Sequence, residues 1–114
     1  EKAQAFENVG GQVIAMANTH RKVDLPKLFA YLAQEHHMNE IHVEAGFKLN
    51  GSLLREDCVD ELLLYYAPFF MGEGIGMANI SPLTALAERK DWQFIDQSMF
   101  GPDLRVRLQK INPA

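Results

Sequence analysis

Residues 40–72 of the chain read EIHVEAGFKLNGSLLREDCVDELLLYYAPFFMG. Residues 41–45 alternate apolar and polar side chains, which is typical of a strand with two unlike faces. Leucines recur at helical spacing between about residues 48 and 56, which predicts a short amphipathic helix. Residues 61–67 are almost wholly apolar, as in a central strand covered on both faces. A strand, a helix and a strand of these lengths predict a βαβ unit, whose two strands run parallel through a right-handed crossover.

Around this unit the sequence predicts a second amphipathic helix and a C-terminal hairpin. Asp24 is a good N-cap, Pro26 suits a first helical turn, and apolar side chains then recur at helical spacing to about residue 35 or 37. The other expected elements are a loop or frayed arm at 1–10, a strand at 12–17, a loop at 68–80, a helical turn from Ser81-Pro82, and antiparallel strands at 92–99 and 104–108. These elements indicate one α/β domain with a mixed sheet.

Composition narrows the class of protein. The chain has 114 residues and a formal net charge of −4, so we expect neither a nucleic acid nor an anionic membrane as a partner. Cys58 is the one cysteine, which rules out an internal disulfide and suits a reducing cytoplasm. The longest apolar run, residues 62–67, is far too short to span a bilayer. We therefore predict a cytoplasmic location.

The turn after the predicted strand at residues 41–45 is the candidate site. Glu44 ends that strand, and Gly46 has no side chain, so a ligand could approach the backbone there. A helix then begins, and its free N–H groups favour an anion, with Lys48, Asn50 and Ser52 as further donors. The turn therefore suits a pyrophosphate. The alternative from spacing alone is an ordinary tight turn with a helix start and no ligand.

Three runs of residues carry a resemblance to a known family. They are Val43-Glu44-Ala45-Gly46-x-x-Leu49-x-Gly51-Ser52-Leu53-Leu54, then Val59-Asp60-Glu61-Leu62, then Ala67-Pro68-x-x-x-Gly72. Together they resemble the reductase domain of the RibD family of bifunctional riboflavin biosynthesis proteins, densely between about residues 41 and 72. The resemblance implies a dihydrofolate-reductase-like fold, with residues 1–114 forming the C-terminal part of the reductase domain. It also implies an upstream deaminase domain in the full-length protein, and a homodimer.

The resemblance also implies an activity and a set of site residues. The activity is NADPH-dependent reduction of 5-amino-6-(5-phosphoribosylamino)uracil to the ribityl form. By position, Glu44 matches a glutamate that contacts the substrate. The loop and helix start that hold the NADPH phosphates match Gly46, Phe47, Lys48, Leu49, Asn50, Gly51 and Ser52. No catalytic residue is assigned, because the groups that face the hydride are expected outside this segment.

Two details depart from, or extend, the family pattern. Phe47 stands where the family usually has a small residue or proline, so its ring either narrows the approach to the turn or points away from it. In dihydrofolate-reductase-like folds the peptide at the position of Ala45-Gly46 is often cis, so we expect a cis bond there. A cis bond before a residue other than proline costs about 3 kcal/mol, so the fold would have to require it.

Other interpretations stay open or are set aside. His42-Val43-Glu44 resembles the H-x-E of zinc deaminases, but that chemistry also needs a P-C-x-x-C pair, so we predict no metal site. An alternative enzyme is another NADPH reductase of the same fold, such as one acting on pterins. An alternative without catalysis is a fragment that serves association only, through its exposed aromatic side chains and hairpin edge.

Overall fold

The computed structural model describes residues 1–111, which fall into two compact units. The first unit, Glu1–Ile41, holds helix α1 (Lys2–Asn8) and helix α2 (Leu25–Glu35). α2 confirms the prediction in detail, because the Asp24 carboxylate accepts a hydrogen bond of 3.1 Å from the N–H of Lys27 and Pro26 lies in the first turn. No helix in residues 1–111 combines the length and the apolar character needed to cross a membrane.

Two predictions for the first unit are wrong. The expected loop or frayed arm at 1–10 contains α1, a seven-residue helix with no side-chain cap and no buried residue. Two exposed helical turns show no apolar periodicity, so nothing in the sequence predicts them. The expected strand at 12–17 makes a single bridge, between Ala17 and Val23. An apolar run becomes a strand only when a partner strand pairs with it, and residues 1–41 contain no strand.

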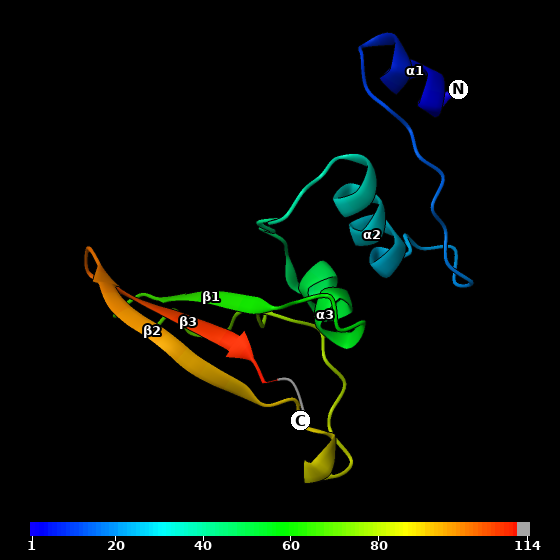
Figure 1. Ribbon diagram of the computed structural model, residues 1–114. Helices are drawn as coiled ribbons and strands as arrows, with labels where there is room; N and C mark the ends of the chain where they lie inside the picture. Colours follow the sequence, from blue (N-terminus) through cyan, green and yellow to red (C-terminus); the bar gives the residue numbers. More distant parts are fainter. Residues whose placement is uncertain (112–114) are drawn as a thin grey trace. The chain divides into compact units, whose positions relative to one another are not determined.

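The second unit, from His42 onward, combines one helix with a three-stranded sheet (Figure 1). Its elements are α3 (Phe47–Arg55), β1 (Glu61–Tyr66), a 3-10 turn η1 (Leu86–Glu88), β2 (Trp92–Phe100) and β3 (Asp103–Lys110). The strand order is β1-β3-β2 and both pairings are antiparallel. The predicted helix, the apolar strand and the C-terminal hairpin are thus confirmed, and residues 68–80 form a loop as expected. The prediction that the apolar strand is central and covered on both faces is wrong, because β1 lies at an edge of the sheet and most of its side chains are exposed.

The predicted βαβ unit is not formed within the described residues. Residues 41–45 form no strand, so β1 has no parallel partner there and the sheet is antiparallel instead of mixed. β1 pairs instead with β3, from Leu108 opposite Leu62 to Leu104 opposite Tyr66, and its other edge carries no strand within residues 1–111. The alternating pattern of residues 41–45 reports which side chains could share a face, but hydrogen bonds to a neighbouring strand are what make a strand.

The two faces of the sheet differ in chemistry. Val106 is buried on the apolar face, between Leu64 of β1 and the β2 strand. Leu53 of α3 is the other side chain that is buried among residues 42–111. The opposite face carries charged cross-strand pairs. The Arg107 guanidinium donates two hydrogen bonds to the Glu61 carboxylate, at 2.8 and 3.1 Å, and these lower the pKa of Glu61.

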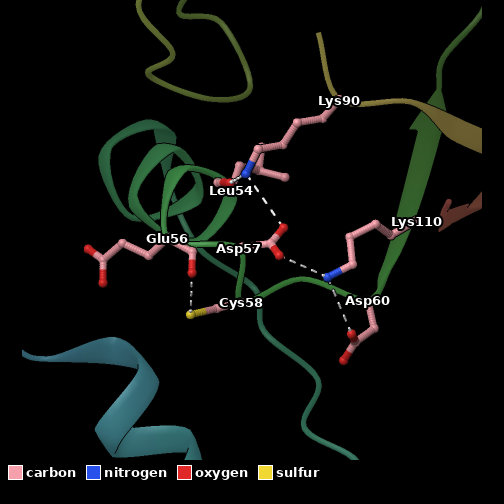
Figure 2. A network of polar contacts seen from close by, with 7 residues as sticks. All are labelled: Leu54, Glu56, Asp57, Cys58, Asp60, Lys90 and Lys110. Atoms are coloured by element: carbon pink, nitrogen blue, oxygen red, sulfur yellow. Dashed lines mark hydrogen bonds and ion pairs between the residues drawn. The ribbon is translucent and has the colours of Figure 1, made fainter. Parts of the chain in front are cut away.

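A polar network fixes the end of α3 to the ends of the strands, as Figure 2 shows. Asp57 lies just after the helix with φ +59°, and its carboxylate lies 3.3 Å from the Lys110 ammonium and 3.5 Å from that of Lys90. Lys90 also donates to the Leu54 carbonyl at 2.8 Å. The hydrogen bond and charge of Lys110 are the main causes that lower the pKa of Asp57. Residues that precede β2 and end β3 therefore hold α3 by its C-terminal end.

Candidate functional site

The start of α3 leaves backbone N–H groups without acceptors in the helix. Gly46 is the N-cap, with φ −91° and ψ 178°, and no side chain caps the helix. The first helical hydrogen bond runs from the N–H of Asn50 to the Gly46 carbonyl, at 3.0 Å. The N–H groups of residues 47–49 therefore precede the helical ladder. A Cβ placed on Gly46 would meet nothing within 4 Å, so the backbone of this turn is open to a ligand.

Phe47 does not close that approach. Its ring lies against Gly76 of the long loop, where a Cβ added to that glycine would stand 3.7 Å from the ring edge. Of the two orientations open from the sequence, the ring thus takes the second and points away from the turn, toward the loop. Lys48 is exposed in the first turn and brings a positive charge to the same end of the helix. The N–H groups, the helix dipole and this ammonium all favour an anion at the turn.

The last three residues matched to the phosphate loop have other contacts. The side-chain amide of Asn50 donates to the carbonyls of Ala45 and Met77, at 3.1 and 2.9 Å. Gly51 is buried against the backbone of Asn79. The Ser52 hydroxyl donates to the Lys48 carbonyl at 3.3 Å. The side chains of Asn50 and Ser52 and the close packing at Gly51 thus serve the helix and the loop on it, which leaves residues 46–49 as the open part of the turn.

Glu44 lies two residues before the N-cap and is 88% exposed. Its carboxylate lies 3.3 Å from Nε2 of His42. The carboxylate therefore remains accessible as a hydrogen-bond acceptor on the same turn as the open backbone. Among residues 1–111, no three His, Cys, Asp or Glu side chains gather as metal ligands, and His42 and Glu44 contact each other.

The prediction of a cis peptide at Ala45-Gly46 is wrong, because the described chain contains no cis bond. The extended backbone of Gly46 leads directly into the helix, and the Ala45 carbonyl has a partner in Asn50. The trans bond avoids the cost of a cis bond, about 3 kcal/mol.

Nothing in the sequence indicates that residues 76–79 pack on α3. The N–H of Asn79 donates to the Phe47 carbonyl at 2.9 Å, and the Arg55 guanidinium donates to the Asn79 carbonyl. The loop has no periodicity, and more than 20 residues separate it from the helix in sequence. Only the buried Gly51, which looks in the sequence like a poor helix residue, hints at a close backbone neighbour.

The family model for the RibD C-terminal domain matches residues 1–106. Among curated proteins, RibD of Haemophilus influenzae is 37% identical over 70 residues, covering 60% of this chain and 19% of that protein. RibD of Escherichia coli is 36% identical over 87 residues, covering 75% of this chain and 23% of that protein. The 5-amino-6-(5-phosphoribosylamino)uracil reductase of Buchnera aphidicola is 30% identical over 90 residues, covering 78% of this chain and 43% of that protein.

Solved structures of RibD proteins share the fold of this chain. RibD of Acinetobacter baumannii, form 1, superposes with a TM-score of 0.80 at 22% identity, over 96% of this chain and 29% of that chain. The fold is therefore dihydrofolate-reductase-like, and this chain spans less than half the length of each of these relatives. The chain belongs to the RibD C-terminal domain family.

Proposed function

We propose that residues 46–49 bind the pyrophosphate of NADPH in a reductase of riboflavin biosynthesis. The substrate would be 5-amino-6-(5-phosphoribosylamino)uracil, which the name of the Buchnera relative contains, and the protein would reduce it to the ribityl form. The observation that carries the proposal is the uncapped start of α3, where the Gly46 backbone is open and no side chain accepts from the first N–H groups. In the proposed arrangement residues 1–114 are the C-terminal part of the reductase domain.

The residues at the turn fit the cofactor. A pyrophosphate carries negative charge, and the helix dipole with the Lys48 ammonium supplies the opposite charge locally, in a chain whose formal net charge is −4. Bound NADPH supplies the hydride. The chain's own task is to hold the phosphates and to orient the nicotinamide-bearing end relative to the substrate. Asn50, Gly51 and Ser52 support this turn through the contacts already described.

Glu44 is proposed to hold the substrate. An exposed carboxylate accepts hydrogen bonds from hydroxyl and amino groups, both of which a phosphoribosylaminouracil presents. The carboxylate precedes the phosphate-binding N–H groups by two residues, so substrate and cofactor would meet at one turn.

The wider setting is proposed on the same basis. Because this chain covers 19% and 23% of two RibD relatives, we propose that the full-length protein carries an upstream deaminase domain. We also propose a cytoplasmic homodimer. β1 and β2 are the edge strands of the sheet, and the aromatic pair Tyr65–Phe100 on one face is mostly exposed, so a second chain has surface to bind.

The test is nucleotide binding followed by turnover in the full-length protein. Trp92 fluorescence and thermal shift would measure affinity for NADPH, with NADH as the control. Glu44→Gln keeps the size of the side chain and removes its charge. We expect it to weaken substrate binding or turnover while NADPH affinity stays within about twofold of wild type. Wild-type protein that binds no NADPH would overturn the cofactor site, and unchanged kinetics of Glu44→Gln would overturn the role of Glu44.

A further inference from the structure

The side-chain amide of Asn50 joins two backbone segments that are far apart in sequence. An amide NH₂ group has two hydrogens, and in Asn50 these donate to the carbonyl of Ala45 at 3.1 Å and to that of Met77 at 2.9 Å. Ala45 lies in the open turn before α3, and Met77 lies in the loop between β1 and β2. Both hydrogen-bond donors of the side chain are thus committed to the backbone.

The hydrogen bond to the Ala45 carbonyl sets the orientation of the Ala45-Gly46 peptide plane. In a trans peptide the carbonyl oxygen and the following N–H lie in one plane and point in opposite directions. The Ala45-Gly46 peptide is trans, so when Asn50 holds the Ala45 carbonyl, the Gly46 N–H must point to the other side. On the Gly46 residue itself a Cβ would meet nothing within 4 Å, so this glycine would not otherwise restrict rotation of the plane.

The hydrogen bond to the Met77 carbonyl restricts the side chain of Asn50. The loop that carries Met77 is itself fixed on α3, because the Asn79 N–H donates to the Phe47 carbonyl at 2.9 Å and Arg55 donates to the Asn79 carbonyl. Gly51 allows this close approach, since a Cβ there would stand 2.8 Å from the Asn79 nitrogen. Asn50 is therefore held from two sides, and its rotamer cannot change without loss of the loop contact.

We infer that Asn50 is a positioning residue for the nucleotide site: it orients the Ala45-Gly46 peptide so that the Gly46 N–H joins those of residues 47–49 in binding the pyrophosphate. The inference rests on the proposed function. Asn50 itself makes no contact with the ligand. Loss of its side-chain donors weakens nucleotide binding through the direction of one backbone N–H.

The test compares two variants that each loosen the loop. Asn50→Leu keeps the approximate volume of the side chain and removes both donors. Arg55→Leu, the matched control, frees the same loop at Asn79 and leaves the Ala45 carbonyl bonded. A hydrogen bond from backbone N–H to a charged phosphate is worth roughly a factor of ten or more in affinity. In full-length protein, we expect the Kd for NADPH to rise about tenfold in Asn50→Leu and to stay within about twofold in Arg55→Leu.

The readouts separate positioning from simple stability. Both variants should unfold at lower temperature than wild type, so each Kd is measured well below the Tm of the variant. Asn50→Leu binding NADPH as tightly as wild type would overturn the inference and leave the proposed function standing. Equal loss of affinity in both variants would also overturn it, because a loosened loop would then explain the effect. Absence of binding in the wild type would overturn the inference together with the proposed function.

Discussion

Replacing Gly51 by alanine should destabilise the protein, although alanine is the better helix residue. Gly51 is buried in α3, and a Cβ there would stand 2.8 Å from both the nitrogen and the carbonyl carbon of Asn79, closer than real Cβ atoms approach. The intrinsic helix preference for alanine stabilises by about 1 kcal/mol. Overpacking costs about 1–3 kcal/mol, and loss of the bond from Asn79 to Phe47 costs about 1 kcal/mol more. The expected net loss is about 1–3 kcal/mol.

Urea unfolding of Gly51→Ala and of a second glycine variant, Gly74→Ala, measures the change in the free energy of unfolding. Gly74→Ala is the matched control, because a Cβ on Gly74 meets nothing within 4 Å and its backbone is not in the left-handed region. Alanine there should be neutral or stabilise by up to about 1 kcal/mol, through the unfolded chain. If Gly51→Ala were as stable as wild type, the loop could not lie on α3 as observed, and the anchoring of Asn50 would lose its basis.

Two further predictions concern charge and turn geometry. The pKa of Asp57 is lowered below its ordinary 3.8, so its stabilising effect is present above that pH and is lost as the pH falls through the folded-state value. Asparagine tolerates the same backbone conformation, so Asp57→Asn should be less stable than wild type at pH 6 only through the lost charge. The difference in the free energy of unfolding should shrink below pH ~3.8, and a difference that does not change with pH would refute this. Gly101 has φ +60° in the turn between β2 and β3, so Gly101→Ala should cost about 1 kcal/mol in urea unfolding, and an unchanged midpoint would contradict that strain.

Local signals predicted the elements that depend on local interactions. The cap at Asp24 and the apolar spacing after it predicted α2, and the alternation after residue 103 predicted β3. In each case the period of the side chains matches the period of the backbone, so the apolar face follows directly from the sequence. The turn at residues 100–103 then made the antiparallel hairpin the natural connection.

Pairing between distant segments could not be predicted in the same way. The alternation at residues 41–45 and the apolar run at 12–17 both predicted strands, and neither has a neighbouring strand in residues 1–111. A strand depends on a partner supplied by another part of the chain, whereas a helix satisfies its own backbone. The partner of β1 proved to be β3, which reverses the expected parallel arrangement.

The candidate site shows the same division between local and distant contacts. Its proposed ligand contacts lie within one turn, so a motif of consecutive residues was enough to find them. The contacts that shape the turn come from the loop at residues 76–79, for which the sequence has no signal. Gly46 and Gly51 belong to one motif, yet they work in opposite ways. Gly46 keeps the backbone open to a ligand, while Gly51 lets another segment of the chain pack so closely that no side chain fits. The second glycine therefore sets the geometry of the first, because the loop that it admits is the anchor through which Asn50 holds the Ala45-Gly46 peptide.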